Sequence, residues 1–371
     1  MRFFQFTGNY LSNRFGELVN LRTEKYDPLK SKNHFPCIEL ENIEQESCIL
    51  NSLFDSIEQK SIKTKFKKGD ILFGKLRPYL KKYIQVDFDG VCSTEIWVMN
   101  SNFLLNRYVF YYIQTNRFLT IANTSSGTKM PRAEWSLIRA SIIKYPNSIE
   151  EMQVVSKFLS LIDQRIETQS KIIEDLEYQI KWIRYKIFRN LNNVPNHRLS
   201  EFLSEYSEKN SNNAFTPVAV GKHGIRKRNE IYNKELSSDY SKNKVIRQNT
   251  LVIGMGSTQI DIGVLSNKET LCVSPAYTTY KINNINASYL NELLIFLNPL
   301  LSKKYMIISA RQGKSVNKKE LLTYKIFVHS NEIQIKIEKL FNLLRFRIQK
   351  EKDILELYKK QKAYLLKNMF I

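Results

Sequence analysis

Lysine and arginine side chains are the residues of this sequence whose types and spacing point most directly to chemistry. Residues 60–82 contain nine of them against the single carboxylate of Asp70, with Phe66, Phe73 and Tyr79 between them. Such cations neutralise phosphate groups, and aromatic rings between them can stack on bases. The stretch predicts a polyanionic partner, and the alternative is a solvated lysine-rich surface.

Further basic clusters follow along the chain: GKHGIRKR at residues 221–228, TKMPR at 128–132 and RQGKSVNKK at 311–319. The last two lie just after or around Gly127 and Gly313. Glycines let a backbone come close to a partner, and a few of the cations could reach base edges in the major groove. The residues that we expect at a nucleic acid are Lys75, Arg77, Lys81, Lys82, Lys129, Arg132, Lys222, Arg226, Lys227, Arg228, Arg311, Lys314 and Lys318.

Enzyme motifs and metal-ligand spacings are missing from the sequence. It has no Walker A loop, and GMGSTQ (254–259) lacks the third glycine of a dinucleotide fingerprint. The Asn/Asp-Pro-Pro-aromatic tetrapeptide of adenine methyltransferases is also absent. The four histidines, His34, His197, His223 and His329, lie far apart. We therefore expect no catalytic residue, no metal site and no cofactor.

Composition limits the class of protein further. The 371 residues have room for two domains, and the net charge of +21 again favours a nucleic acid. Cys37, Cys48, Cys92 and Cys272 show no CxxC spacing, which indicates free thiols in a reducing compartment. No apolar run is long enough to cross a membrane, and the N-terminus does not read as a signal peptide. We expect a cytoplasmic protein.

The chain contains an internal duplication with a unit of about 180 residues. FLSLIDQRI at residues 158–166 returns as LFNLLRFRI at 340–348, which is 182 positions later. Upstream, DILFG (70–74) precedes TLVIG (250–254) by 180, and Cys92 precedes Cys272 by the same number. We expect each half to be a complete copy with its own core.

Each half begins with an α+β region and ends with a long helix. Strands are predicted at 70–76, 83–88, 95–100, 250–255, 262–266 and 277–282, with Gly90 in a turn. Residues 104–122 and 289–297 each predict a helix. The expected organisation is a globular domain over 1–148, a long helix over 149–190, a second domain over 191–330 and a second helix over 331–371.

The two long helices predict an antiparallel coiled-coil pair. Apolar residues step by four and three in both, and a 3.5-residue repeat favours a partner helix. LNNVPN (191–196) is too short to return the chain along the first helix, so we expect helix two to run back. The alternative is two separate helices, each packed on its own domain. The predicted seam comprises Leu159, Ile162, Ile166, Gln169, Ile173, Phe341, Leu344, Ile348, Glu351 and Leu355.

These motifs together resemble the specificity subunit of type I restriction-modification systems. The resemblance rests on GDILFGKLRPYLKK (69–82), CSTEIWVM (92–99), SSGTKMPRAEW (125–135) and the helix from 148 to 180. Both halves carry the pattern, and the first matches more closely. The second departs from it, since Arg345 stands in place of Asp163.

The resemblance implies a DNA-recognition protein without catalytic activity. It implies two duplicated target recognition domains, each reading one half of a bipartite site in double-stranded DNA, separated by two long antiparallel helices. It also implies two methyltransferase (modification) subunits docked on the helices, with restriction and translocase subunits joined through the complex. The main alternative is an autonomous DNA-binding regulator. A self-contained methyltransferase and a structural coiled-coil protein fit the sequence less well.

Overall fold

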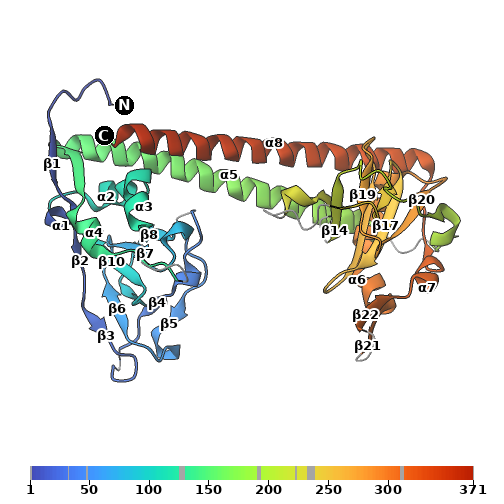
Figure 1. Cartoon of the computed structure of the whole chain (residues 1–371), viewed down its shortest axis with the longest axis horizontal. Helices are drawn as coiled ribbons and strands as arrows, with labels where there is room; N and C mark the ends of the chain where they lie inside the picture. Colours follow the sequence, from blue (N-terminus) through green and yellow to red (C-terminus); the bar gives the residue numbers. More distant parts are fainter. Residues whose placement is uncertain are drawn as a thin grey trace. The chain divides into compact units, whose positions relative to one another are not determined.

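The computed structural model describes residues 2–31, 33–46, 49–124, 130–189, 194–221, 224–231, 239–309 and 313–370. The chain divides into two compact units. Unit 1 consists of Met1–Lys171 together with Lys352–Ile371, and unit 2 consists of Ile172–Glu351. The long helices α5 (Ile149–Arg189) and α8 (Asn331–Met369) therefore each belong partly to one unit and partly to the other (Figure 1).

Unit 1 contains a four-stranded sheet in the order β2-β10-β7-β8, a five-stranded sheet in the order β3-β6-β9-β4-β5, and the antiparallel pair β1-β11. Its strands are β1 (Tyr10–Arg14), β2 (Asn20–Leu21), β3 (Lys25–Tyr26), β4 (Pro36–Ile38), β5 (Phe54–Asp55), β6 (Lys63–Phe66), β7 (Ile71–Gly74), β8 (Tyr83–Gln85), β9 (Gly90–Ser93), β10 (Ile96–Asn100) and β11 (Ile142–Pro146). Its shorter helices are α1 (Phe15–Leu18), α2 (Asn106–Tyr112), α3 (Asn116–Ala122) and α4 (Trp135–Ala140), with 3-10 turns η1 (Leu40–Asn42), η2 (Ser56–Glu58) and η3 (Pro78–Leu80).

Unit 2 contains four-stranded sheets in the orders β13-β20-β17-β18 and β15-β14-β19-β16, and the pairs β12-β23 and β21-β22. Its strands are β12 (His197–Arg198), β13 (Leu203–Tyr206), β14 (Pro217–Gly221), β15 (Gly224–Lys227), β16 (Lys244–Ile246), β17 (Thr250–Met255), β18 (Ile260–Leu265), β19 (Leu271–Val273), β20 (Thr278–Ile282), β21 (Met306–Ser309), β22 (Gly313–Val316) and β23 (Lys325–Ile326). Its shorter helices are α6 (Ala287–Tyr305) and α7 (Lys318–Leu322), with η4 (Leu199–Phe202) and η5 (Arg228–Glu230).

The strand pairing reproduces the duplication in three dimensions. The order β2-β10-β7-β8 in unit 1 matches β13-β20-β17-β18 in unit 2. In the second sheet, β9 pairs parallel with β4 and antiparallel with β6, and β19 does the same with β14 and β16. Cys92 and Cys272 occupy equivalent buried positions in these central strands. The expected α+β class is confirmed.

Three expectations for local structure are wrong. The single helix expected over 104–122 is two helices, because Thr115 caps α3 by accepting a hydrogen bond from the Phe118 amide. Gly90, expected in a turn, begins β9, where its position against Phe66 and the Pro36 carbonyl leaves no room for a Cβ. The helix expected over 289–297 continues through Pro299 to Tyr305.

The core of unit 1 is aromatic and includes the end of the chain. Tyr108 and Tyr112 of α2 lie beside Phe370, with ring centroids 5.0 and 6.1 Å apart. Leu365, Leu366 and Met369 of α8 belong to the same buried cluster. The expectation that each half has a complete core of its own is therefore wrong for unit 1, which needs the last turns of α8.

The long helices run antiparallel in each unit. In unit 1, Val155 near the start of α5 and Met369 at the end of α8 share one core, and Lys362 lies 2.7 Å from Asp163. In unit 2, the Arg184 guanidinium of α5 lies 5.7 Å from the ring centroid of Phe341 in α8. The first half of one helix thus packs against the second half of the other.

Residues of the predicted seam lie on the buried side of these helices. Those that are buried are Leu159, Ile162, Gln169, Ile173, Phe341 and Ile348, and those that are half-buried are Ile166, Leu344, Glu351 and Leu355. Glu351 faces Arg347 of its own helix at 3.9 Å. A seam of this kind excludes water along one stripe of each helix.

A carboxylate joins the α+β region to the long helices in each unit, but it lies on opposite sides of the junction in the two units. In unit 1, the Tyr111 hydroxyl of α2 donates to the Asp163 carboxylate of α5, which also pairs with Lys362. Tyr111 and Glu292 are both the sixth residue of their helices, α2 and α6. Arg345 stands 182 positions after Asp163, so it takes the place of Asp163 in the second repeat. The carboxylate of this junction is then Glu292 of α6, the domain helix of unit 2.

The unit 2 junction is a buried carboxylate between two guanidinium groups. Glu292 is fully buried, and it accepts hydrogen bonds from Arg184 at 2.9 Å and from Arg345. Burial lowers the pKa of Arg184, and burial followed by the nearby Arg184 lowers the pKa of Arg345. Without the carboxylate, the two guanidinium groups would face each other, and Arg184 is largely shielded from water.

Replacing the central carboxylate should destabilise unit 2. Glu292→Gln removes the charge that both arginines require, and breaking a buried pair in this way costs about 3 kcal/mol. Thermal unfolding of unit 2 should shift downward by roughly 10 °C. Glu332→Gln is the matched control, because Glu332 forms an exposed pair with Lys336 within α8 and should change the midpoint little. Equal midpoints for the two variants would contradict a stabilising role for Glu292.

Candidate functional site

Two segments that are far apart in the sequence form one surface in unit 1. Residues 75–82 connect β7 to β8, and residues 130–133 lie directly beside them. The Arg77 amide donates to the Pro131 carbonyl at 2.8 Å, and the Ala133 amide donates to the Lys75 carbonyl at 2.8 Å. Leu76 and Arg132 form a β-bridge between the segments. We call residues 75–82 and 130–133 the unit 1 loop pair.

Five of the cations predicted to contact nucleic acid lie on this loop pair, and they differ in their local partners. Arg132 donates two hydrogen bonds to Glu95, at 3.0 and 3.3 Å, and this interaction raises the pKa of Arg132. Lys81 pairs with Glu46, and the Lys82 amino group donates to the Leu40 carbonyl at 2.6 Å.

Lys75 and Arg77 are the cations of the loop pair best placed for an external anion. No carboxylate of the described residues lies within ion-pair distance of either side chain, and Arg77 is exposed. Arg77 has a φ of 52°, a left-handed conformation that turns the chain into η3. Exposed side chains of Tyr79 and Met130 lie in the same loop pair and could contact sugars or bases. Lys129 and Gly127 fall outside the described residues.

Unit 2 has an equivalent loop pair at the same edge of the matching sheet. Residues 256–259 connect β17 to β18, as residues 75–82 connect β7 to β8. The Lys314 amino group of β22 donates to the Ser257 carbonyl at 2.6 Å. We call residues 256–259 and 313–316 the unit 2 loop pair. Arg311 falls outside the described residues.

Lys318, also predicted at the nucleic acid, points into unit 2. Its amino group donates to the Thr278 hydroxyl at the start of β20. Burial, followed by the nearby Lys244, lowers the pKa of Lys318. This lysine is therefore less suited to a phosphate contact than Lys314.

The β14-β15 hairpin carries the remaining predicted cations. Arg226 is exposed, whereas Lys227 pairs with Glu269 at 2.8 Å, which raises the pKa of Lys227. The Arg228 guanidinium lies 5.9 Å from the Tyr240 ring centroid, and its buried Nε has no hydrogen-bond partner among the described residues. Lys222 falls outside the described residues.

The turn end of the β14-β15 hairpin and the unit 2 loop pair meet at Asp261, a residue that the sequence analysis did not single out. The Tyr277 hydroxyl lies 3.3 Å from the Val220 carbonyl and 3.4 Å from the Asp261 carboxylate. A Cβ on Gly256 would lie 2.5 Å from the Asp261 carboxylate. The glycines of GMGSTQ (254–259) therefore allow close packing around Asp261. The incomplete dinucleotide motif was the sequence feature that could have drawn attention to Asp261.

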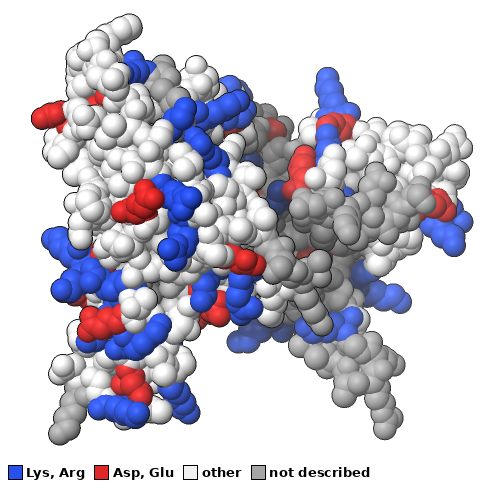
Figure 2. Space-filling model, turned by 60° about the vertical axis from the view of Figure 1, so that its left-hand side comes forward, with Lys and Arg blue, Asp and Glu red and all other residues white. Residues whose placement is uncertain are grey.

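Positive charge is spread widely over the surface. Figure 2 shows Lys and Arg side chains over much of the face that it presents, with fewer Asp and Glu side chains among them. This arrangement suits a long polyanion better than a small charged ligand, because the cations do not converge on one cavity.

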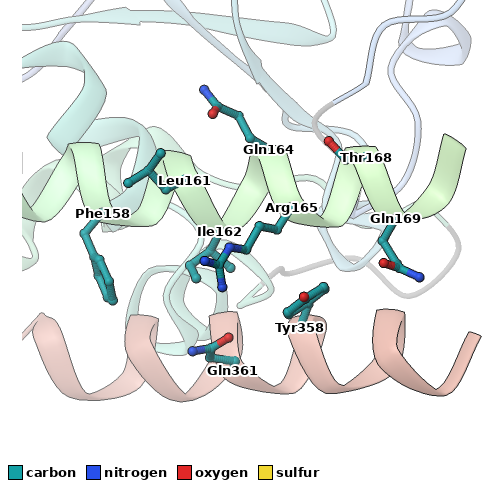
Figure 3. A pocket seen from close by; sticks show the side chains of 9 residues that line it. All are labelled: Phe158, Leu161, Ile162, Gln164, Arg165, Thr168, Gln169, Tyr358 and Gln361. Carbon is teal, nitrogen blue, oxygen red and sulfur yellow. The ribbon is translucent and has the colours of Figure 1, made fainter. Parts of the chain in front are cut away.

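A groove lies between α5 and α8 in unit 1. Figure 3 shows Phe158, Ile162 and Arg165 pointing from α5 toward α8, and Tyr358 pointing back. Gln169 also lines this groove. The lining holds no pair of acid and base side chains that could transfer a proton.

The part of the chain that the structure describes contains neither a metal-binding cluster nor a membrane-spanning helix. No cluster of three or more His, Cys, Asp or Glu side chains there has the arrangement of a metal site. No helix there is both long and apolar enough to cross a membrane.

Comparison with known proteins finds one family. The model described as the type I restriction modification DNA specificity domain matches residues 12–178. The chain is 31% identical over 98 residues to the type I restriction enzyme EcoDI specificity subunit of Escherichia coli, and 29% identical over 145 residues to the HindI specificity subunit of Haemophilus influenzae. These alignments cover 26% and 35% of this chain and only 22% and 31% of the relatives.

Solved structures resemble the fold of nearly the whole chain. A chain from a study of complex assembly and conformational transition of the type I R-M system aligns over 98% of both chains, with a TM-score of 0.63 and 18% identity. The type I restriction-modification S subunit from M. genitalium aligns over 99% of this chain and 98% of its own, with a TM-score of 0.53 and 15% identity. At these identities the likeness shows the fold alone.

The unit 1 loop pair should contribute directly to the binding of duplex DNA or another polyanion. Lys75→Gln combined with Arg77→Asn removes the two cations without carboxylate partners, and Asn tolerates the left-handed backbone at position 77. If both contact phosphates, the slope of log affinity against log salt should fall by about two. Titrations of a duplex at several salt concentrations measure that slope.

The matched control for this titration changes the net charge equally elsewhere in unit 1. Lys30 and Lys157 are both exposed, and Lys30→Gln with Lys157→Gln should leave the slope nearly unchanged. Equal slopes for the two double variants would place the polyanion away from the unit 1 loop pair.

Proposed function

We propose that this chain, which belongs to the type I restriction modification DNA specificity family, is the DNA-recognition subunit of a type I restriction-modification complex. Each α+β region would read one half of a bipartite site in double-stranded DNA. The recognition domains are taken as residues 1–148 and 191–330, with the long helices over 149–190 and 331–371. The chain itself would carry out no catalytic step.

The observation that carries this proposal is the pair of equivalent loop pairs. Both units place a β-strand connection beside a second segment at the same edge of a matching sheet. The basic side chains of the two loop pairs differ: unit 1 has Lys75 and Arg77, and unit 2 has Lys314. Two equivalent frames with different side chains are what two half-sites of different sequence would require.

The catalytic work would fall to partners docked on the long helices. Tyr178, Trp182 and Tyr185 are exposed and lie on one face of α5 in unit 2, since they are spaced by four and three residues. Cations stack on two of these rings, Lys186 on Trp182 and Arg189 on Tyr185. Exposed aromatic residues beside cations are typical of protein interfaces.

The partners proposed for this surface are two modification subunits that methylate adenine. They would flip the target base into pockets of their own, since this sequence shows no methyltransferase motif. Restriction and translocase subunits would join through the complex.

Exchange of one recognition domain tests the proposal most simply. Residues 1–148 are replaced by the same region of a relative, and the chimera is expressed with its modification subunits. One half of the methylated sequence should change and the other should stay, because unit 2 is unaltered. The donor must keep aromatic residues at positions 108 and 112, since both rings contact Phe370. A change in both halves would show that the units do not read DNA separately.

The same chimera tests the docking surface. Trp182→Ser in the chimera should abolish methylation while DNA binding persists, because the ring would anchor a partner and not DNA. Lys181→Ser changes the exposed neighbouring residue and should leave methylation intact. Sequence-specific binding that needs no modification subunit, with no methylation in any combination, would instead favour an autonomous DNA-binding regulator.

A further inference from the structure

We propose that Asp261 is a specificity-determining residue of unit 2, which accepts a hydrogen bond from the exocyclic amino group of a base. The base would be adenine or cytosine, since these present an amino donor in the major groove. This inference rests on the proposed function, because it assigns a role to one side chain within the DNA-reading surface of unit 2.

Asp261 occupies the edge of the sheet where unit 1 carries its basic loop. It is the second residue of β18 and pairs with Gly254, directly after the β17-β18 connection. Lys314 is anchored on Ser257 in that same connection. A carboxylate therefore lies directly after the β17-β18 connection of unit 2, whereas the equivalent β7-β8 connection of unit 1 carries Lys75 and Arg77.

The Asp261 carboxylate has unused capacity to accept hydrogen bonds. Its one hydrogen-bond partner among the described residues is the Tyr277 hydroxyl at 3.4 Å, and none of their cations forms an ion pair with it. An ionised carboxylate offers about four acceptor sites. Burial raises the pKa of Asp261, which is the expected effect of partial desolvation without a cation.

Unit 1 has a carboxylate nearby, but it stands at the position equivalent to Tyr277 and is paired with an arginine. Glu95 stands one residue before β10, as Tyr277 stands one residue before β20. Both Glu95 oxygens accept from Arg132, so that carboxylate cannot read a base without releasing the arginine. At this edge of the sheet, unit 1 presents cations. Unit 2 presents the Asp261 carboxylate, which forms no ion pair among the described residues and accepts a hydrogen bond from Tyr277.

Glycines leave the space around Asp261 free of side chains. A Cβ on Gly256 would meet the Asp261 carboxylate, and one on Gly254 would lie 2.1 Å from the Tyr277 ring. Gly221 lies at the end of β14. A Cβ at this position would lie 3.9 Å from the Asp261 carboxylate. Asp261 is half-buried, so part of the residue is in contact with solvent.

The chemistry of this position selects against phosphate and in favour of an amine. A carboxylate repels the DNA backbone, so it gains nothing from phosphate contacts. It matches cytosine N4 or adenine N6, and it rejects guanine O6 and thymine O4, which are acceptors themselves. Asp261 would therefore specify one base pair and contribute little to affinity for unrelated DNA.

The test is selection from a duplex library in which every position is randomised, using the full chain. Asp261→Asn keeps the shape of the side chain but adds donor groups. Discrimination for adenine or cytosine should fall about tenfold at one position of one half-site, with the other positions unchanged. The base preferred by the unaltered chain at that position decides between the two amines. Glu205→Gln, which removes an exposed carboxylate elsewhere in unit 2, should leave every position unchanged.

Tyr277→Phe provides a second variant that keeps the ring packed on Gly254 and removes only the hydroxyl. It should weaken discrimination at the same position, because Asp261 loses the group that orients it. An unchanged selection pattern for Asp261→Asn would overturn the inference. So would a loss spread over a whole half-site, which indicates a structural role. If the unaltered chain selects no sequence at all, the proposed function fails before Asp261 is tested.

Discussion

The antiparallel packing of α5 against α8 is the constraint on which the rest of the structure depends. Each unit combines part of α5 with the opposite part of α8, and unit 1 is therefore built from two separate stretches of sequence. Phe370, one residue from the end of the chain, fills the aromatic core that begins with Phe15. Unit 1 therefore depends on contacts between residues more than 250 positions apart in the sequence, which raise its contact order.

The charged residues at the two junctions favour one pairing of each domain with its own part of the helix pair. Asp163 belongs to the long helix in unit 1, whereas the buried Glu292 belongs to the domain helix in unit 2. Placing the unit 2 domain helix against the unit 1 helix pair would set Glu292 against Asp163 with only Lys362 to compensate. Uncompensated buried carboxylates are costly, so the inversion favours one arrangement of two very similar domains.

The frame shared by the units is predictable from sequence to a large extent. Seams with a 3.5-residue period predicted α5 and α8, and strand-like segments predicted β7, β8, β10, β17, β18 and β20. The missed features are tertiary in origin. Thr115 breaks a helix whose apolar pattern continues across it, and nothing in the local sequence near Phe370 indicates that its ring completes a core more than 250 residues away.

The candidate site was predictable in composition but not in geometry. A dense run of lysines and arginines predicted the surface around Lys75 and Arg77, since charge is visible in sequence. The contact between residues 75–82 and 130–133 depends on backbone hydrogen bonds that no residue type announces. Asp261 was missed for a related reason, because a single carboxylate near the start of a strand is ordinary until its neighbours are known.

Sequence selection by the unaltered chain tests the central claim most directly. Duplexes with a long randomised region are incubated with the full chain and the proposed modification subunits, and the bound fraction is sequenced. Two recognition units joined by one helix pair predict two short specified stretches, separated by a gap of constant length without base preference. A single uninterrupted specified stretch, or two stretches at variable spacing, would contradict the account.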